Sequence, residues 1–527
     1  MDLLKYVSSY GKTNRKKIFR RFFSKFHEKV KIGEKWNSVV GLEVHAQISS
    51  KSKLFSNAGT AFASPINSTV SFFDSAIPGT LPVLNRRCVE AGVTTALALS
   101  CKINQVSLFD RKHYFYSDLP TGYQITQQRK PLAVDGIIKF NVINPVSQKE
   151  SYSKQSKIKQ LQLEQDSGRS LHDEENERSL IDLNRAGVPL MELVFEPDLR
   201  DGEEAASLIK ELCAILSRLG TCSCRMEEGA FRVDANVSVN RPGEPLGVRT
   251  EIKNIGSVRA VAAAVDFEIE RQILMLEEGQ EIFNETRSWN PELNKTVTMR
   301  DKEVKNDYRF MPEPNLPPLR LHLDRNVKNE NNLVDVPYLN DQLPEMPEET
   351  RQKLREKFAI SQDHIIVITY NPSLLEIFYN VMKTNEKRCA KTVAKILVNF
   401  FLEVLNKKNL KVENCSISHE YFGEAIDLLQ DESINLNIIR KLFYEMLRNP
   451  QISPKQIIKE KNLEQISDIE ELTRICQKII DDNPKAVKSY KGGKKKVFQF
   501  FINQTLKSTY ERANISKTIE VFNKLLH

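Results

Sequence analysis

The sequence predicts an α+β protein in which a mixed or antiparallel sheet comes first and an all-helical region follows. Strict alternation of apolar and polar residues over 231–240, and again over 248–253, predicts two half-buried strands that the turn residues of 241–245 join into a hairpin. Helical patterns begin at Pro347 and continue to the C-terminus. The proline-rich stretch 311–318 and the polar stretch 326–332 separate the two regions, so we expect the first domain to end near residue 325.

Length and composition indicate a multidomain protein without membrane segments. A chain of 527 residues is too long for one core and predicts three or four domains. No apolar run approaches the roughly 20 residues that span a bilayer, so we expect no membrane association. The eight cysteines form no paired C-x-x-C motif, and only Cys222 and Cys224 are close together, which argues against a zinc ribbon or a disulfide framework. We expect the thiols to be reduced.

Positive charge is concentrated at the two ends of the chain, whose net charge is +8. Residues 1–37 hold eleven Lys and Arg against three acids, and residues 484–527 hold ten against two, so the body between them is acidic. Residues 1–35 are also rich in Ser, and Phe19, Phe22, Phe23 and Phe26 gather on one side of a helix. This composition is typical of a mitochondrial transit peptide; a basic RNA-binding arm is the alternative.

A first strand is predicted over 40–48, where apolar residues alternate with Glu43, His45 and Gln47. The alternation places a carboxylate and an imidazole two positions apart on one face, which is chelating geometry for a divalent ion. A lone histidine on a strand is usually structural. Glu43 and His45 together, on a face otherwise short of charge, favour a functional site.

The predicted hairpin over 231–254 has an unusual polar face. An ordinary solvated face carries flexible Lys, Glu and Thr, whereas here short acids and amides lie between two arginines. Such a set suits a metal ion and phosphate oxygens, and a solvated outer face is the alternative. The residues of this face are Arg232, Asp234, Asn236, Ser238, Arg249, Glu251 and Lys253.

Two further segments carry groups suited to binding. Residues 110–127 combine aromatic, basic and amide side chains and end in a Pro/Gly turn, which suits stacking on a base and holding phosphates, or else a rigid aromatic loop. In 161–168, leucines alternate with Gln162 and Glu164 before a turn. Helices predicted over 86–100, 201–220 and 257–279 cover the core and imply no function; Asp201 begins the second and Gly220 ends it.

The last basic stretch, 485–507, combines a glycine turn with lysines. Gly492 and Gly493 precede Lys494, Lys495 and Lys496, and phenylalanines follow. A glycine turn that opens a basic helix suits a nucleic-acid backbone, with solvated helix charge as the alternative.

Taken together, these stretches resemble the GatB family, the B subunits of glutamyl-tRNA(Gln) amidotransferases. The matching runs include Val-Gly-Leu-Glu-Val-His at 40–45, Asp-Leu-Asn-Arg-Ala-Gly at 182–187 and Glu-Ile-Lys-Asn at 251–254, together with 110–120, 122–127, 196–198, 226–229, 234–236 and 307–314. The resemblance extends from about residue 38 to the end of the chain. So many long runs in the same order make it highly specific.

The resemblance implies a fold and a domain order. We expect a transit peptide over 1–35, a cradle-shaped catalytic domain on a mixed sheet over 36–325, a linker and helical domain over 326–375, and an all-α tail domain that binds tRNA over 376–527. It also implies a carbon–nitrogen ligase that works in the mitochondrial matrix. ATP phosphorylates the glutamyl side chain of mischarged glutamyl-tRNA(Gln), and ammonia then displaces the phosphate to give glutaminyl-tRNA(Gln).

The resemblance also assigns roles to residues of this chain. The catalytic set is Glu43, His45, Glu164, Asp234 and Glu251. The magnesium ligands are Glu43, His45, Gln165, Asp234 and Glu251, and the expected ATP-binding residues are Arg111, Tyr116, Tyr123, Gln124, Arg232, Asn236, Arg249 and Lys253.

Two departures from the bacterial pattern affect these assignments. A Glu-Glu-Asp run in bacterial members reads Glu164-Gln165-Asp166 here, so Gln165 as a metal ligand is in doubt and Glu164 is the alternative. Some bacterial members also carry a zinc-binding cysteine set where this chain has Ser56, Ser71 and Asp74. We therefore expect no zinc.

The chain contains no Gly-Gly-Ser-Ser-Gly amidase run, so the ammonia must come from elsewhere. The resemblance implies two partners, a separate glutaminase known as the A subunit and a small C subunit, with Lys494, Lys495 and Lys496 contacting the tRNA. The strongest alternative is a non-catalytic tRNA-binding or assembly protein with the same fold, although the intact acids at 43, 234 and 251 argue against it. A metal-dependent hydrolase lacks an obvious nucleophile or base.

Overall fold

The computed structural model describes residues 35–142, 151–299, 308–385 and 387–526. It divides into two compact units, the first ending at Met346 and the second beginning at Pro347. The expected domain boundary near 325 lies inside the first unit. The expected transit peptide covers residues 1–35, and all of it except residue 35 lies outside the described part of the chain.

The first unit is built on a nine-stranded mixed sheet with the order β13-β12-β11-β10-β1-β9-β6-β5-β2. Neighbouring strands are antiparallel except β11 and β12, which are parallel. This agrees with the mixed sheet that the sequence predicts. The strands are β1 (Asn37–Gln47), β2 (Lys102–Ile103), β5 (Ala133–Val142), β6 (Tyr152–Gln165), β9 (Pro189–Phe195), β10 (Phe231–Asn240), β11 (Thr250–Lys253), β12 (Thr286–Asn290) and β13 (Lys295–Thr298).

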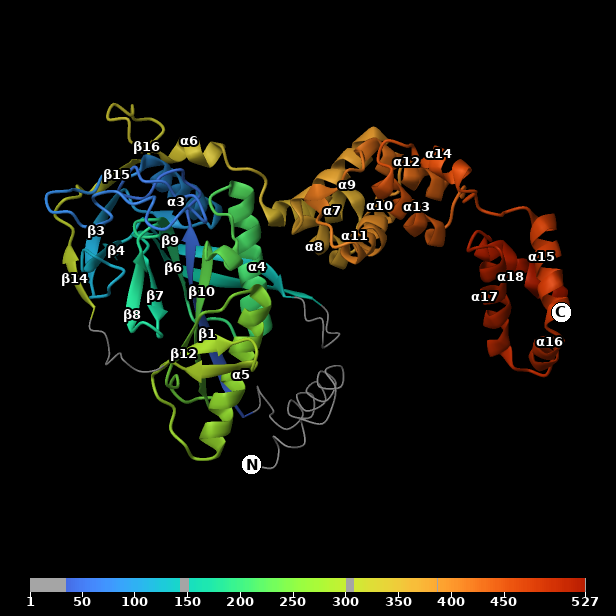
Figure 1. Cartoon of the computed structure of the whole chain (residues 1–527), viewed down its shortest axis with the longest axis horizontal. Helices are drawn as coiled ribbons and strands as arrows, with labels where there is room; N and C mark the ends of the chain where they lie inside the picture. The colour runs from blue at the N-terminus through green and yellow to red at the C-terminus, as the bar shows by residue number, and fades with distance from the viewer. Residues whose placement is uncertain (1–34, 143–150, 300–307, 386, 527) are drawn as a thin grey trace. The chain divides into compact units, whose positions relative to one another are not determined.

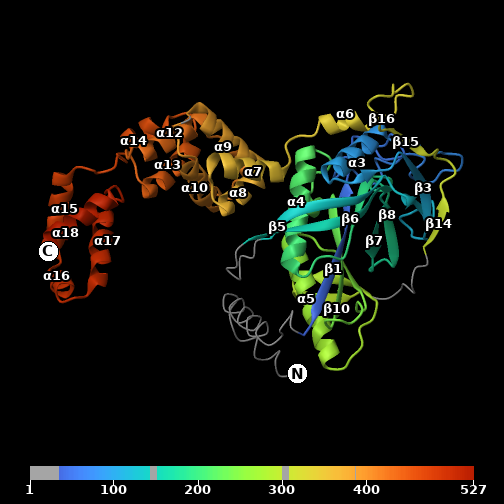
Figure 2. The ribbon, with the colours of Figure 1, turned by 180° about the vertical axis from the view of Figure 1, so that it is seen from behind.

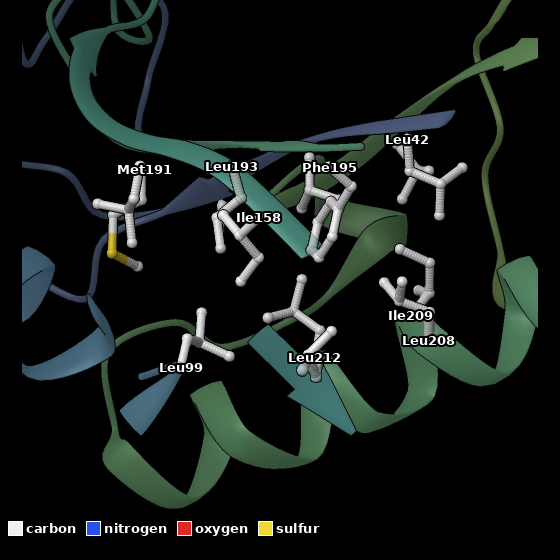
Figure 3. Close-up of a cluster of buried hydrophobic side chains, with 14 of the residues drawn as sticks. Leu42, Leu99, Ile158, Met191, Leu193, Phe195, Leu208, Ile209 and Leu212 are labelled. Atoms are coloured by element: carbon white, nitrogen blue, oxygen red, sulfur yellow. The ribbon is translucent and has the colours of Figure 1, made fainter. Parts of the chain in front are cut away.

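Helices α3 (Arg86–Ala98), α4 (Gly202–Leu219) and α5 (Val258–Glu277) contribute apolar side chains to the core of this unit. Helices α4 and α5 contact each other, and both pack against the large sheet (Figures 1 and 2). Asp201 caps α4 by accepting from Glu204 N, and Gly220 ends it in the left-handed conformation, as the sequence predicts. Leu193 and Phe195 of β9 face Leu212 of α4 (Figure 3). The apolar half of each alternating strand is therefore buried and the polar half is directed to the other face.

A smaller sheet packs against the polar face of the large one. It has the order β14-β3-β15-β16, with β4 paired to β3, and Gln124 of β4 donates to Glu164 of β6. Gln162 of β6 likewise donates to Thr126 of β4. The strands are β3 (Val106–His113), β4 (Tyr123–Lys130), β14 (Arg309–Pro312), β15 (Leu319–His322) and β16 (Val334–Asp335); β7 (Arg169–Asp173) and β8 (Arg178–Asp182) form a separate hairpin, and η1 (Met226–Glu228) and α6 (Val336–Asp341) complete the unit.

The second unit is helical, as predicted, and contains two separate hydrophobic clusters. One draws on residues 354–458 and the other on residues 472–526. Its elements are α7 (Pro347–Phe358), α8 (Gln362–Thr369), α9 (Pro372–Thr384), α10 (Ala390–Lys395), the π-helical η2 (Ile396–Phe401), α11 (Leu402–Lys407), η3 (Val412–Asn414), α12 (His419–Gln430), α13 (Leu436–Arg448), α14 (Pro454–Glu460), α15 (Ile469–Asp482), α16 (Pro484–Lys491), η4 (Lys495–Val497), α17 (Phe498–Ser508) and α18 (Ile515–Leu526). Among the described residues no single helix has the length and apolar composition to cross a bilayer, while α8 and α9 meet that test only as a pair bent by 113°.

The second strand of the predicted hairpin is shorter than its alternation suggests. Pairing with β10 starts at Thr250, so Val248 is exposed and Arg249 lies in the connecting loop. The loop makes its own hydrogen bonds, because the Asn240 amide donates to the carbonyls of Arg241 and Glu244. The prediction that Val248 is buried is therefore wrong, because pairing with β10 begins only at Thr250. Arg249 lies outside the ladder, and its place among the site residues stays a prediction.

Candidate functional site

The polar face of the large sheet carries a continuous row of polar side chains, most of them ionisable, across five adjacent strands. The pairing register sets Glu43 of β1 opposite Asp234 of β10, and His45 opposite both Arg232 and Glu192. Because the side chains alternate along each strand, residues that are distant in sequence meet on one face. From β11 to β6 the row consists of Glu251, Lys253, Arg232, Asp234, Asn236, Glu43, His45, Glu192, Gln162 and Glu164.

One end of the row is a compact cluster of His45, Glu164 and Glu192. Each residue offers one ligand atom, and these atoms all lie within 4.8 Å of one another. His45 Nε2 is 3.9 Å from Glu192 Oε1. Glu164 Oε1 accepts from Gln124 Nε2 at 2.5 Å, and Glu192 Oε2 accepts from Gln162 Nε2 at 2.5 Å. The amides thus hold both carboxylates in place while leaving oxygens directed at the histidine.

The other end of the row holds three carboxylates, two of which contact one ammonium. Lys253 Nζ lies 3.5 Å from Glu251 Oε1 and 3.9 Å from Asp234 Oδ2. Asn236 Nδ2 donates to Glu43 Oε1 at 3.0 Å. The four residues Glu43, Asp234, Glu251 and Lys253 therefore sit next to the histidine cluster in one acidic face.

Electrostatics make this face attractive to cations. Burial, with repulsion from Glu192, raises the pKa of Glu164 to about 7. Burial also raises the pKa of Glu192 and that of Asp234, although Lys253 opposes the shift at Asp234. Burial disfavours the charged form of Lys112 on β3, but attraction by Glu164 and Glu192 outweighs it, so the pKa of Lys112 is raised.

The residues present fit a hard divalent cation. Glu164 Oε2 and Asn236 Oδ1 are buried, and neither has a hydrogen-bond partner within the described part of the chain. Carboxylate oxygens, an amide oxygen and an imidazole form a donor set that accepts Mg²⁺ or a similar metal. Like-charged carboxylates at this spacing repel one another when ionised, and a bound cation would relieve that repulsion.

The structure separates the two candidates that the sequence leaves open on β6. Glu164 belongs to the His45 cluster. Gln165 is the next residue on the strand, so alternation directs its side chain to the opposite face. Only its backbone carbonyl is engaged near the site, accepting from Gln124 at 2.6 Å. The geometry therefore disagrees with Gln165 as a side-chain ligand.

The residues expected to bind ATP lie at different places. Gln124 joins the acidic face through Glu164, and Arg232 reaches it while donating to Asp166 Oδ2 at 2.9 Å. Arg111 forms a two-bond ion pair with Glu313, at 2.6 and 3.0 Å, and its guanidinium lies 4.2 Å over the Tyr123 ring.

Two of the expected ATP-binding residues lie in connecting loops. Tyr116 joins the network indirectly, because its ring contacts that of Tyr114, whose hydroxyl donates to Gln124 Oε1. Tyr116 is 45% exposed, in the connection between β3 and β4. Arg249 is exposed in its loop, away from the ladder that aligns the other site residues.

Two residues of the face were missed from sequence. Glu192 is the only charged residue in β9, and this isolated acid in a strand of apolar residues was a usable signal. Lys112 lies within the predicted 110–127 segment, but its approach to Glu164 and Glu192 depends on how the second sheet packs. No local pattern encodes that packing.

The positions where some bacterial members carry cysteines form a buried polar cluster here. Lys53 Nζ donates to Asp74 Oδ2 at 3.0 Å. Asp74 also accepts from Ser56 Oγ at 3.2 Å and from Ser71 N at 2.8 Å. An ammonium thus lies among these side chains, and its pKa is lowered by burial.

The lysines expected to contact tRNA lie in the second unit. Lys494, Lys495 and Lys496 are exposed, and the last two belong to η4. Gly493 before them has φ +93°, which only glycine adopts without strain, so the glycine turn is real.

Comparison with known proteins gives two domain matches, one in each unit of the structure. Residues 38–326 match the GatB/GatE catalytic domain, and residues 376–526 match the GatB domain. The chain is 51% identical to the mitochondrial B subunit of glutamyl-tRNA(Gln) amidotransferase of Drosophila melanogaster, over 93% of this chain and 95% of that protein.

Two more distant relatives agree. The protein of the same name from Homo sapiens is 47% identical over 95% of this chain and 90% of its own length. The B subunit of the aspartyl/glutamyl-tRNA(Asn/Gln) amidotransferase of Rickettsia bellii is 42% identical over 91% of this chain and 95% of its own. With both domain models and full-length relatives matched, the chain belongs to the GatB family.

Proposed function

We propose that this chain is the B subunit of a mitochondrial tRNA-dependent amidotransferase that converts glutamyl-tRNA(Gln) to glutaminyl-tRNA(Gln) with ATP. Family membership and the names of the fly and human relatives support this assignment. The observation that carries the chemistry is the acidic face, where carboxylates of separate strands and His45 converge.

The reaction needs such a face because a carboxylate is a poor acyl electrophile. Phosphorylation of the glutamyl side chain supplies a leaving group, and ammonia then forms the new carbon–nitrogen bond. Transfer of the phosphoryl group places negative charge on oxygens that positive groups must stabilise.

The acidic face would hold Mg²⁺ through Glu43, His45, Asp234 and Glu251, with Glu164 and Glu192 completing the donor set. When bound, Mg²⁺ neutralises charge on the transferring phosphoryl oxygens. Glu164 is preferred over Gln165 because its carboxylate lies in the His45 cluster. The catalytic set then remains Glu43, His45, Glu164, Asp234 and Glu251, with Glu192 added.

Cationic side chains at the edges of the face would orient the phosphates. Lys253 borders Asp234 and Glu251, Lys112 borders Glu164 and Glu192, and Arg232 is fixed by Asp166. The remaining nucleotide contacts would come from Asn236, Arg249 and the aromatic segment with Arg111, Tyr116, Tyr123 and Gln124. The ion pair of Arg111 with Glu313 makes Arg111 a support for the Tyr123 ring in this proposal.

The names of the relatives, each given as one subunit of an amidotransferase, imply partner chains. The partners we propose are a glutaminase (the A subunit) as the ammonia source, a small C subunit, and glutamyl-tRNA(Gln) bound through Lys494, Lys495 and Lys496. The proposed location is the mitochondrial matrix.

Substitution of one carboxylate separates catalysis from binding. Asp234→Asn keeps the size of the side chain and removes the charge at the centre of the row. In the reconstituted complex, supplied with ammonium so that the glutaminase is bypassed, we expect ATP-dependent transamidation to fall about 100-fold or more. The affinity for glutamyl-tRNA(Gln), measured by filter binding, should not change.

Asp173→Asn is the matched control, since Asp173 lies on the separate β7–β8 hairpin and pairs with Arg178. It should leave both readouts unchanged. Full transamidation by Asp234→Asn would refute the catalytic proposal and favour the alternative of a non-catalytic tRNA-binding protein.

A further inference from the structure

Three cysteines meet at the C-terminal end of α4 and the start of the connection to β10. Cys213 lies on α4, and Cys222 and Cys224 follow its end. The Cys224 thiol donates to the carbonyl of Cys213 at 3.6 Å, and Cys224 N donates to Cys222 Sγ at 3.3 Å. All three thiols are free. This cluster has no part in the proposed reaction.

The backbone and the local exposure single out Cys224 within the cluster. Its φ is 55°, in the left-handed region that residues with a Cβ seldom adopt, and this turn directs the chain back past α4. Cys213 and Cys224 are half-buried, with exposed Ser223 and Arg225 on either side of Cys224, whereas Cys222 is buried. A small oxidant can therefore reach Cys224 from solvent.

The neighbouring thiols also favour the reactive form of Cys224. Hydrogen bonds from the side chains of Cys213, Cys222 and Ser217 lower the pKa of Cys224, against the opposing effect of burial. The pKa of Cys213 is raised by its hydrogen bond to Cys224 and by its partial burial. Cys224 is therefore the more readily ionised of the two half-buried thiols, as suits an attacking cysteine, and Cys213 is the less readily ionised, as suits a resolving one.

We propose that Cys224 and Cys213 form a peroxide-sensitive modification site in which Cys224 is oxidised first and Cys213 resolves it to a disulfide. The Cys224 thiolate attacks one oxygen of hydrogen peroxide, the O–O bond breaks, and hydroxide leaves as Cys224 becomes a sulfenic acid. The Cys213 sulfur then attacks the Cys224 sulfur, and the sulfenic hydroxyl departs with the Cys213 proton as water. In sum, two thiols lose two electrons and peroxide is reduced to two waters.

Cys213 is the resolving thiol rather than Cys222. A disulfide between residues 222 and 224 would close a ring around one intervening residue, where the required separation of the two Cα atoms is hard to reach without strain. Residues 213 and 224 come from two different segments, and the Cys224 sulfur already touches the Cys213 carbonyl.

The test treats the full-length reduced chain with hydrogen peroxide in the presence of a chelator and follows each cysteine by mass spectrometry. We expect a disulfide between Cys213 and Cys224, with a mass loss of two hydrogen atoms. In Cys213→Ser, Cys224 should instead accumulate as a sulfenic acid that dimedone traps. Cys389 supplies the internal reference, because it is exposed and its pKa is also lowered, by hydrogen bonds from Thr392.

Comparison with Cys389 makes the outcome decisive. Disulfide formation at Cys224 should be at least about tenfold faster than at Cys389, because the fold holds Cys213 against Cys224. Equal rates of disulfide formation at the two positions, or no disulfide at Cys224, would overturn the site. A disulfide between Cys222 and Cys224 would overturn the assignment of Cys213. Circular dichroism of Cys213→Ser, Cys224→Ser and the Cys389→Ser control should match that of the wild type, so that loss of fold does not imitate loss of the site.

Discussion

Asp266 lies on α5, outside the acidic face, and its ionisation opposes folding. Its Oδ1 accepts from Gly202 N at 2.8 Å, at the start of α4. Burial raises the pKa of Asp266 to about 7, the Gly202 hydrogen bond opposes this, and Asp201 and Glu203 add to it. The buried Lys53 differs, because Asp74 contacts its ammonium directly. Burial thus opposes ionisation at both residues, and of the two only Lys53 has a counter-ion in contact with it.

This contrast predicts a pH-dependent gain in stability for Asp266→Asn. The unfolded carboxyl titrates near its ordinary 3.8 and the folded one near 7, so between these values the folded state binds more protons and its stability falls as pH rises. The amide keeps the acceptor for Gly202 N without the charge. At about pH 8 we expect the variant to be more stable by on the order of 1 kcal/mol, and we expect the gain to vanish below about pH 4.

Chemical denaturation of the first unit across this pH range measures the effect. The control is Asp173→Asn, whose pKa is lowered by Asn176 and Arg178, so loss of its charge should bring no gain at any pH. A pH-independent difference between Asp266→Asn and the wild type would contradict the assigned ionisation.

At the scale of elements, alternation within each strand was enough to predict much of the site. It placed Glu43 and His45 on one face of β1 and Asp234 and Asn236 on one face of β10, as the structure has them. Alternation cannot say which strands become neighbours. β1 lies between β9 and β10, and both of these strands are remote from β1 in the sequence. The contact of His45 with Glu192 was therefore not predicted.

The predicted hairpin shows a second limit, because alternation in the sequence can extend beyond the end of the strand. The pattern continued through residues 248 and 249, but hydrogen bonds within the loop ended the ladder at Thr250. Packing between sheets was equally hidden, since Lys112 reaches the acidic face only through contacts between β4 and β6.

The tail of the second unit carries its own prediction. Lys494, Lys495 and Lys496 are exposed beside a glycine turn, which suits contacts to phosphates rather than to bases. Replacing all three by Ala should weaken binding of glutamyl-tRNA(Gln) and reduce the slope of log affinity against log salt by about 2 to 3. ATP binding should not change.

Fluorescence anisotropy of labelled tRNA over a salt series measures this slope. Replacing Lys383, Lys387 and Lys391, three lysines elsewhere in the helical unit, provides a control with the same change in net charge. An unchanged affinity in the 494–496 variant, or an equal loss in the control, would remove these lysines from the tRNA-binding surface.

For the whole molecule, the two units divide the proposed work. The first unit carries the acidic face and matches the catalytic domain of the family, and the second carries the basic tail. The division explains why a chain with a net charge of +8 can hold a concentrated acidic site. The account rests on that site taking a divalent cation through side chains of separate strands.

Titration of the full-length chain with Mn²⁺, followed by the electron paramagnetic resonance of free Mn²⁺, tests this most directly. The account predicts that Mn²⁺ binds saturably and that Mg²⁺ displaces the bound Mn²⁺. It also predicts that Glu192→Gln, which removes one carboxylate from the His45 cluster, weakens binding about tenfold or more, while Asp173→Asn has no effect. Absence of saturable binding to the wild type, or equal binding by Glu192→Gln, would contradict it.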